Sequence, residues 1–337
     1  MNRRTFFKAI GAGTAIAALP YDAKAEESEP KKPKMASIID ITLCDGCDRL
    51  EAPRCVLACR EKNTGKFPEP REEDVEDYSP RENREDWSKK RDVINRLTPY
   101  NWTYIESVIV GRQKIFIPRR CMHCNEPVCR KLCPFGVISK EEMGAVKIDP
   151  DYCFGGGKCR DVCPWGIPQR QVGIGIYTRI APRLIGGGAM YKCDMCTDVL
   201  SEFREPPCAA NCPRRAIMFG EKRYMLEEAE RRARTMNGYF YGMVEAGGTA
   251  TYYVSKVSFE EIDKAIKEKK SAENDKDFGR PNMPVGIKNP LRHSGRLLAA
   301  ALIAPVAAVA AAAIVVHKDG KKNAENDAKK SEDKDKQ

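Results

Sequence analysis

Histidine is scarce in this chain, and no catalytic pattern that depends on it is present. The 337 residues include three histidines, His123, His293 and His317. His123 lies inside a run of cysteines and the other two lie beside an apolar segment, so none is placed as a general base near a nucleophile. We therefore expect no substrate site of its own. The alternative, a self-contained oxidoreductase, would show turnover as a purified chain.

Three further patterns are absent, and each absence excludes a class of function. No C-x-x-C pair is followed by histidine, which excludes covalent haem at these pairs. The glycines at 173–175 and 186–188 form too short a pattern for a dinucleotide-binding loop. Basic residues exceed acidic ones by only 58 to 48, and no basic helix alternates with aromatic residues, which argues against nucleic-acid binding.

The first 25 residues have the features of an export signal. Arg3 and Arg4 precede a short apolar stretch rich in glycine and alanine, and Ala23-Lys24-Ala25 is typical of a cleavage site. The paired arginines favour the twin-arginine route over a general secretory signal. Because that route exports folded proteins, a cofactor can be inserted before export.

Residues 297–316 form one apolar segment without a charged residue, long enough to cross a bilayer once as a helix. The segment is rich in alanine and only weakly hydrophobic, so a buried or interfacial helix is the alternative. The absence of a polar face favours a transmembrane helix. We predict a single-pass protein of the inner (cytoplasmic) membrane, with the main domain facing the periplasm and a charged tail at 317–337 in the cytoplasm.

Cysteine, by contrast, is abundant: the chain has 15, gathered in four groups. An odd number cannot pair completely in disulfides within one chain. Every group ends in C-x3-C, and proline follows three of them, as in the run C-x2-C-x2-C-x3-C-P that binds iron–sulfur clusters in ferredoxins. The last cysteine of such a run is expected to begin a helix, which the following proline suits. The apolar residues that follow are expected to shield the metal centre from water; they are Phe135, Val137, Ile138, Trp165, Ile167, Ala216 and Ile217. The groups are Cys44, Cys47, Cys55 and Cys59; Cys121, Cys124, Cys129 and Cys133; Cys153, Cys159 and Cys163; and Cys193, Cys196, Cys208 and Cys212.

Zinc and disulfide bonds are the alternative uses of these cysteines. Structural zinc sites combine two separated pairs into one tetrahedron, whereas each group here has its own C-x3-C ending. Disulfides would suit an exported chain, but closely grouped thiols fit cluster ligation better. Iron bound by the cysteines is therefore favoured, and a membrane-anchored structural zinc or disulfide protein without a redox role is the alternative.

The four cysteine groups resemble those of the four-cluster, ferredoxin-like electron-transfer subunits of periplasmic respiratory complexes, including the beta subunits of dimethyl sulfoxide reductase-like enzymes. The export signal and the C-terminal apolar segment are similar to those of the anchored iron–sulfur subunits of hydrogenase-2 and of the high-molecular-weight cytochrome complex. The resemblance covers about residues 36–220. It implies an α+β fold of tandem ferredoxin-like domains, of the bacterial 2[4Fe-4S] type with insertions, followed by a single transmembrane helix.

The resemblance also implies how four clusters share the cysteines: the outer groups pair with each other, and the inner groups pair with each other. Gly156 stands at the position of the sixteenth ligand, so the fourth cluster is expected to be [3Fe-4S] and the other three [4Fe-4S]. A fourth [4Fe-4S] cluster with a non-cysteine ligand is the alternative. The implied iron ligands are Cys44, Cys47, Cys55 and Cys212 (cluster 1); Cys59, Cys193, Cys196 and Cys208 (cluster 2); Cys121, Cys124, Cys129 and Cys163 (cluster 3); and Cys133, Cys153 and Cys159 (cluster 4).

The rest of the sequence is divided by composition. Residues 26–35 have the composition of a linker, and residues 61–96 that of a charged surface insertion. A β-hairpin is expected around Gly111, and helices are expected at 221–234 and 260–270. Residues 221–290 are expected to form a C-terminal extension that ends, at 271–290, in an irregular tether to the membrane. The C-x7-C spacing before Cys55 predicts an outward loop.

The function implied by the resemblance is electron transfer through a series of clusters. One partner would be an extracytoplasmic redox subunit, namely a hydrogenase, a molybdopterin enzyme or a multihaem cytochrome. The other would be a polytopic membrane subunit that exchanges electrons with quinone. His123 is expected to donate a hydrogen bond near a cluster rather than to act as a base.

Overall fold

The computed structural model describes residues 32–75, 85–180, 187–202 and 204–289. The protein divides into two compact units, Met1–Lys32 and Pro33–Gln337, and all the elements below belong to the second. The expected signal peptide at 1–25 and the expected transmembrane helix at 297–316 lie outside the described residues. Within the described ranges, no helix is long and apolar enough to cross a membrane.

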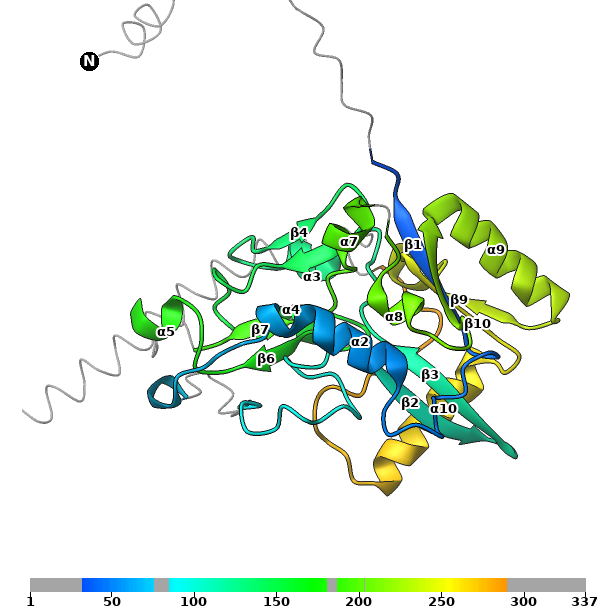
Figure 1. Ribbon diagram of the computed structural model, residues 1–337, viewed down its shortest axis with the longest axis horizontal. Coiled ribbons are helices and arrows are strands. Elements are labelled where there is room, and N and C mark those ends of the chain that lie inside the picture. Colours follow the sequence, from blue (N-terminus) through cyan, green and yellow to red (C-terminus); the bar gives the residue numbers. More distant parts are fainter. Residues whose placement is uncertain (1–31, 76–84, 181–186, 203, 290–337) are drawn as a thin grey trace, which may run out of the picture. The chain divides into compact units, whose positions relative to one another are not determined.

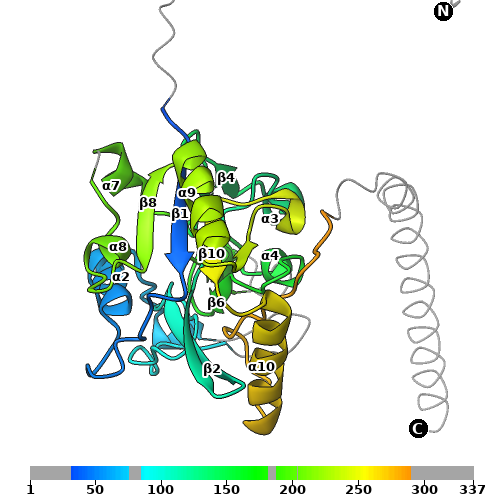
Figure 2. The ribbon, with the colours of Figure 1, turned by 90° about the vertical axis from the view of Figure 1, so that its right-hand side faces the viewer.

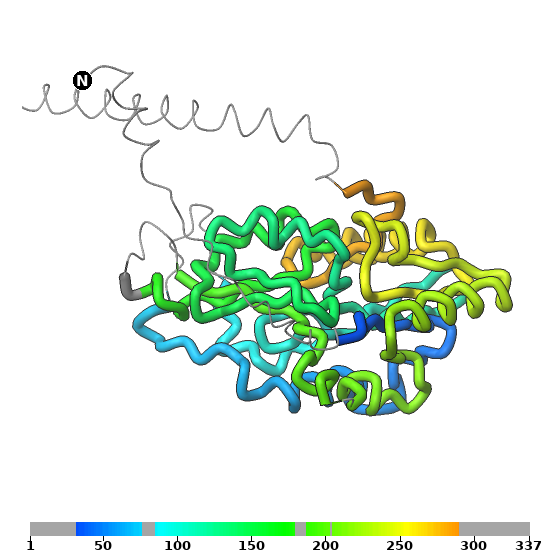
Figure 3. The backbone as a smooth tube through the Cα atoms, turned by 90° about the horizontal axis from the view of Figure 1, so that it is seen from above, coloured from blue at the N-terminus to red at the C-terminus, as the bar shows by residue number. Residues whose placement is uncertain are grey.

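A four-stranded sheet brings distant parts of the sequence together. Its order is β8 (Ile217–Glu221), β1 (Met35–Asp40), β10 (Thr251–Ser255) and β9 (Tyr239–Tyr241). β1 is parallel to β10 and antiparallel to β8. Strand β1 is buried after its first residue, including its two polar residues, Ser37 and Asp40. Figure 3 shows this first strand (dark blue) beside the yellow-green tube of the C-terminal third.

Helix α9 (Lys222–Thr235) covers one face of this sheet (Figure 2). Its small or apolar residues recur every four positions, as Met225, Ala229 and Ala233, and all three are buried against the strands. The remaining face of the helix is densely charged and carries ion pairs such as Glu230 with Arg234. The helix expected at 221–234 is therefore confirmed.

A β-hairpin leads the chain into the second cysteine group. Strands β2 (Tyr104–Val110) and β3 (Gln113–Arg119) pair in the register Tyr104 to Arg119, with Gly111 in the turn at a left-handed φ of 60°. This confirms the expected hairpin. Helix α10 (Phe259–Ala272) begins at its N-cap Ser258 and packs along β2, as Figures 1 and 2 both show.

The remaining elements are short and surround the cysteine groups. Figure 1 labels most of them. They are α2 (Arg54–Asn63), α3 (Val128–Lys131), β4 (Ile138–Lys140), β5 (Val146–Ile148), α4 (Lys158–Asp161), β6 (Gln169–Gln171), α5 (Tyr177–Ile180), β7 (Ala189–Tyr191), α7 (Thr197–Ser201), α8 (Pro207–Ala210) and the 3-10 turns η1 (Thr64–Lys66), η2 (Glu72–Asp74) and η3 (Glu245–Gly247).

The segment after α10 does not leave the domain as the expected tether would. Residues 273–289 lack regular structure, but they lie against the core: Gly279 accepts a hydrogen bond from the Leu97 amide, and the Met283 side chain is fully buried. Side chains of the domain hold this segment in place. For example, the Asp263 carboxylate on α10 accepts a hydrogen bond from the Met283 amide at 2.7 Å. The extension is therefore part of the fold through residue 289.

Part of the charged insertion at 61–96 is packed against the domain rather than exposed to solvent. Glu85 is buried, and both of its carboxylate oxygens accept hydrogen bonds from Arg160, at 2.5 and 2.7 Å. The Trp87 amide donates to the Gln171 side chain at 2.9 Å. The end of the insertion is thus docked beside the third cysteine group, because a buried carboxylate needs a cationic partner.

Glu106 is the anionic centre that holds the C-terminal extension on the hairpin. Its side chain is 2% exposed and accepts from Arg280 Nε at 3.1 Å and Nη2 at 3.0 Å, and from Lys269 Nζ at 3.0 Å. Burial would raise the pKa of the Glu106 carboxyl, but the hydrogen bonds and charges of Arg280 and Lys269 hold it below its ordinary value. Both cations lie in the extension, so Glu106 joins β2 to it.

We expect Glu106→Ala to lower the free energy of unfolding by about 2–4 kcal/mol, because it removes three charge-assisted hydrogen bonds from a buried site, while Arg280 keeps its ion pairs with Asp275 and Glu273. Denaturant titration of the cluster-loaded protein, followed by circular dichroism, measures this. Glu227→Ala removes an exposed carboxylate from α9 and should change the free energy of unfolding by about 0.5 kcal/mol at most. Equal effects of the two substitutions would contradict the anchoring role of Glu106.

Candidate metal centres

The first candidate centre joins the two ends of the cysteine-rich region. Cys44, Cys47, Cys55 and Cys212 line one cavity, together with apolar residues of the hairpin and of β8. The turn before Cys55 is exposed, with Leu50 45% accessible, whereas Cys55 itself is buried at the start of α2. The outward loop predicted from the long spacing is therefore present, and it returns Cys55 to the other three cysteines.

The second candidate centre lies one helical turn further along α2. Its cavity is lined by Cys59 from that helix and by Cys193, Cys196 and Cys208. The Asn63 amide group donates to the Cys59 sulfur, with 3.6 Å between nitrogen and sulfur. Because Cys55 and Cys59 are four residues apart on one helix, α2 contributes one sulfur to each of two neighbouring centres.

The third and fourth candidate centres are built from the two inner groups. After burial, the charges that most raise the pKa of Cys124 are those of Cys163, Cys121 and Cys129. The third implied set of cysteines therefore lies together.

For Cys159, the corresponding neighbours after burial are Cys153, Cys129, Cys163 and Cys133. Cys159 thus lies with Cys153 and Cys133 and close to the third set. Helices α3 and α4, which carry Cys129 and Cys159, pack against each other.

The helices lie on the other side of the terminal cysteines from where the sequence placed them. We expected the last cysteine of each group to begin a helix opened by the following proline. Instead, Cys129, Cys159 and Cys208 lie in short helices that end two residues before the last cysteine. A residue before proline disfavours the helical backbone, so these helices stop before the C-P pair. No helix begins after the pair, because Gly136, Gly166 and Arg215 have left-handed backbones.

The first two positions of each group are joined by the same kind of loop. In all four loops the third residue has a left-handed backbone: Gly46, His123, Met195 and Gly155, with φ between 47° and 72°. In three of them the next residue is a cysteine. In the fourth it is Gly156, which therefore occupies the same place in its loop as Cys47, Cys124 and Cys196 do in theirs.

Burial keeps several of the sulfurs protonated as long as no cation binds them. Burial raises the pKa of the Cys44 and Cys129 thiols to about 12 and that of Cys193 to about 11. Backbone amides nonetheless point at several sulfurs, as the His123 amide does at Cys121 and the Met195 amide at Cys193, both at 3.4 Å. A metal centre would displace the protons and use these amides as donors to thiolates.

Two buried cations lie among the sulfurs. Arg120 lines the second cavity, and burial would lower its pKa, but the charges of Cys208 and Cys193 raise it above its ordinary value. Burial likewise would lower the pKa of Lys192, and Cys121, Cys129 and Cys193 raise it. Lys192 therefore lies between the second and third sets of cysteines.

These cations have no carboxylate ion pair within the described part of the protein. Arg120 donates to the Ser37 hydroxyl and stacks on Phe219 at 4.6 Å, while its Nε is buried without a partner. A buried charge is costly unless an opposite charge faces it. Thiolate-bound iron–sulfur clusters are anionic, so the residues present fit such groups.

His123 points to the same conclusion. It is fully buried, its Nδ1 accepts from the Val146 amide at 3.0 Å, and its Nε2 has no partner. Burial first, and then the charges of Lys192, Arg120 and Lys140, lower the pKa of the imidazole well below its ordinary value. Since Nδ1 accepts, Nε2 carries the proton of the neutral ring and is free to donate to an acceptor beside the cysteines.

The cysteines are not arranged around a single metal ion. In the described ranges, no group of three or more His, Cys, Asp or Glu side chains is spaced to hold one ion. Four sulfurs around a cavity are instead the arrangement found at the first and second centres.

Comparison with known proteins agrees with this arrangement. Residues 112–222 match the 4Fe-4S dicluster domain family. The Hydrogenase-2 operon protein HybA of Escherichia coli O157:H7 is 28% identical over 305 residues, covering 78% of this protein and 83% of the relative. The iron–sulfur subunit of the nitrate-inducible formate dehydrogenase of Escherichia coli K12 is 32% identical over 231 residues, covering 66% and 68%. This protein belongs to the iron–sulfur electron-transfer subunits of respiratory oxidoreductases.

A third relative is a subunit of the anaerobic dimethyl sulfoxide reductase of Escherichia coli K12. It is 32% identical over 185 residues, covering 54% of this protein and 71% of the relative. As a member of this family, the protein is an electron-transfer component of an oxidoreductase complex rather than its catalytic subunit. The expectation drawn from the scarcity of histidine is therefore confirmed.

Apolar residues shield the centres of this iron–sulfur subunit from water, as the sequence predicted for most of them. Ile138, Trp165 and Ile217 are all buried. The exception is Phe135, which is 42% exposed and packs instead against Phe154 and Tyr177. Low water access raises the cost of charging a cluster, so this shell contributes to the potentials.

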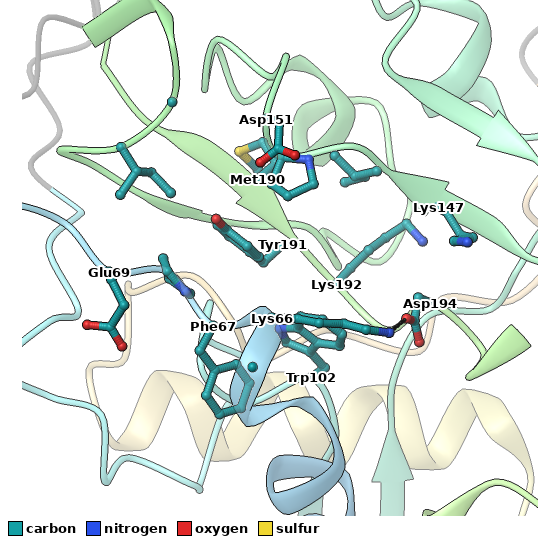
Figure 4. Close-up of a pocket in the computed structure, with 16 residues that line it drawn as sticks. Lys66, Phe67, Glu69, Trp102, Lys147, Asp151, Met190, Tyr191, Lys192 and Asp194 are labelled. Atoms are coloured by element: carbon teal, nitrogen blue, oxygen red, sulfur yellow. Dashed lines mark hydrogen bonds and ion pairs between the residues drawn. The ribbon is translucent and has the colours of Figure 1, made fainter. Parts of the chain in front are cut away.

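A separate cavity of about 520 Å³ lies beside the centres without a cysteine in its lining (Figure 4). The close-up shows Trp102 and Phe67 on one side and Tyr191 on the other. Lys66 crosses its edge to form an ion pair with Asp194 at 2.6 Å. Because Asp194 and Lys192 flank Cys193, the wall of this cavity is also a wall of the second centre.

Sequence reasoning missed Arg120, Lys192 and Phe154. A signal for the first two exists, because each is a basic residue directly before the first cysteine of its group. Phe154 follows the first cysteine of the third group, and nothing in its sequence position shows that its ring reaches Gly156.

Proposed function

We propose that this subunit carries four iron–sulfur clusters and passes electrons along them. The observation that carries the proposal is the gathering of 15 cysteines into four sets, each drawn from two groups far apart in the sequence. When bound, such clusters supply one-electron redox chemistry at potentials set by hydrogen bonds, net charge and solvent access. The protein supplies the thiolates, the amide donors and the buried cations.

The assignment of ligands follows the four sets. Cys44, Cys47, Cys55 and Cys212 would hold cluster 1, and Cys59, Cys193, Cys196 and Cys208 cluster 2. Cys121, Cys124, Cys129 and Cys163 would hold cluster 3. Cys133, Cys153 and Cys159 would hold cluster 4, which is [3Fe-4S] because Gly156 offers no fourth ligand. A tandem ferredoxin-like architecture for about residues 36–220 is part of this proposal.

Two partners and a location complete the proposal. The relatives include subunits of a formate dehydrogenase and of a dimethyl sulfoxide reductase, which supports a redox enzyme as one partner. The paired arginines and the apolar segment at 297–316 support a periplasmic domain anchored in the inner membrane. A quinone-interacting membrane subunit would be the second partner, and the anchor would place the clusters near it.

Iron and acid-labile sulfide analysis of the anaerobically purified protein, with electron paramagnetic resonance before and after reduction, tests this proposal. We expect about 15 irons per chain and an oxidised-state [3Fe-4S] signal. About 16 irons without that signal would mean that a non-cysteine ligand completes the fourth cluster. A colourless protein that holds zinc or disulfides and no iron would overturn the proposal.

A further inference from the structure

Three consecutive glycines, Gly155, Gly156 and Gly157, lie in the third cysteine group, and they are required for different structural reasons. Gly155 and Gly157 have left-handed backbones, with φ of 72° and 71°. A Cβ on Gly155 would also lie 2.8 Å from the backbone carbonyl of Gly188. These two glycines are therefore required by the path of the backbone itself, since other residues rarely adopt such φ values.

Gly156 is required for another reason. Its φ lies outside the left-handed range, so its backbone would accept any residue. However, a Cβ built on it would lie 2.4 Å from Cε2 and 2.5 Å from Cζ of Phe154, far inside van der Waals contact. The ring of Phe154, and not the backbone, excludes a side chain at the position where the other three loops carry a cysteine.

The ring of Phe154 is itself held in place. Its centroid lies 4.4 Å from that of Phe135, whose ring lies 5.3 Å from that of Tyr177. Phe154 is half-buried and Gly156 is exposed, so this corner of the fourth centre lies at the protein surface. At such a place a missing ligand would otherwise leave room for water or an external ligand, and the aromatic stack occupies that room.

We propose that Phe154 is a plug that closes the fourth-ligand position of the centre formed by Cys133, Cys153 and Cys159. This inference rests on the proposed cluster-binding function. Two features then select a three-iron cluster: Gly156 supplies no ligand, and the Phe154 ring keeps other ligands and a fourth iron out of the corner. A thiol introduced at Gly156 cannot reach the cluster unless the ring is also removed.

The test compares three variants after anaerobic reconstitution with ferrous iron and sulfide. Gly156→Cys alone should keep the oxidised-state three-iron signal at close to one per chain. Phe154→Ala with Gly156→Cys should lose that signal by about tenfold or more and gain one iron per chain. Phe154→Tyr with Gly156→Cys keeps a ring in place and should behave like Gly156→Cys alone, which makes it the matched control.

A second measurement reports on the introduced thiol itself, and its overturning outcome is read from Gly156→Cys alone. In Gly156→Cys the introduced thiol should be alkylated by iodoacetamide under native conditions, whereas in Phe154→Ala with Gly156→Cys it should be protected as a ligand. Mass spectrometry of the modified peptide distinguishes the two. Conversion of Gly156→Cys alone to a four-iron cluster, with its thiol protected, would overturn the plug.

The outcomes also separate this inference from the function on which it rests. If the unaltered protein binds iron and shows four [4Fe-4S] clusters, the plug is wrong and the electron-transfer function stands. If the unaltered protein binds no iron, the proposed function itself is wrong. Signals of the other three clusters, unchanged in every variant, show that the rest of the domain is folded.

Discussion

Replacing Cys196 with serine is expected to stop electron transfer through the assembled complex. The cysteines of the proposed second centre come from α2, from the loop that carries Cys193 and Cys196, and from α8. Its Cys208 lies near Cys55 of the first centre, and Lys192 lies between it and the third centre. It thus stands between centres rather than at an end. Serine offers a hydroxyl in place of a thiolate, which binds iron far more weakly.

We expect turnover of the complex to fall by at least about 100-fold, since changes to groups behind the ligands already cost about 10–100-fold. The purified Cys196→Ser variant should hold about four irons fewer or show one altered signal, with the other three signals unchanged. Ala210→Ser introduces the same hydroxyl at an exposed position beside the last cysteine group and serves as the control. Unchanged turnover with an empty second centre would contradict the proposed electron path.

The grouping of the cysteines was the part of the site that sequence could predict best. Repeated short spacings constrain where sulfurs can lie: the first two implied sets line two cavities, and cysteines of the other two implied sets are close neighbours. The irregular spacing before Cys55 did not establish whether Cys55 lies with the other three cysteines, because a loop of that length can follow many paths. The burial of Cys55 on α2 resolves that point.

The C-terminal extension shows what sequence could not predict. Residues 271–290 have no hydrophobic period, and their charges are typical of a solvated segment. Their docking depends on single contacts with distant residues, such as Arg280 with Glu106 and Arg96 with Asp275. Such pairs leave no pattern in a single sequence, because the partners are about 170 residues apart.

The same limit applies to the interior charges. A lysine or arginine before a cysteine is most often solvated, and only the structure shows Arg120 and Lys192 buried among sulfurs. The expected helix after each C-P pair is absent for a local reason, because Gly136, Gly166 and Arg215, each two residues after the proline, have left-handed backbones. The twin-arginine signal and the membrane helix remain predictions from sequence.

Removing the charge of Arg120 is expected to have the second large effect, a change in the reduction potential of the second cluster. Its guanidinium is 2% exposed, lines the second cavity, and has the sulfurs of Cys208 and Cys193 as its main electrostatic neighbours. A fixed positive charge beside a cluster stabilises the reduced, more negative state. Methionine has a similar length and no charge, so Arg120→Met should lower the reduction potential of the second cluster.

The expected decrease is about 40–170 mV, because a unit charge within a few Å contributes ~1–4 kcal/mol depending on screening and ~1.4 kcal/mol equals about 59 mV for one electron. A redox titration followed by electron paramagnetic resonance measures it. Arg120→Lys keeps the charge and should restore most of the potential, which a purely structural role would not explain.

Arg119→Met is the matched control: Arg119 is equally buried, but its guanidinium lies over Tyr253 and donates to the Asn282 carbonyl at 2.7 Å. An equal decrease in Arg119→Met would show that the loss of any buried arginine, rather than the charge facing the cysteines, sets the potential.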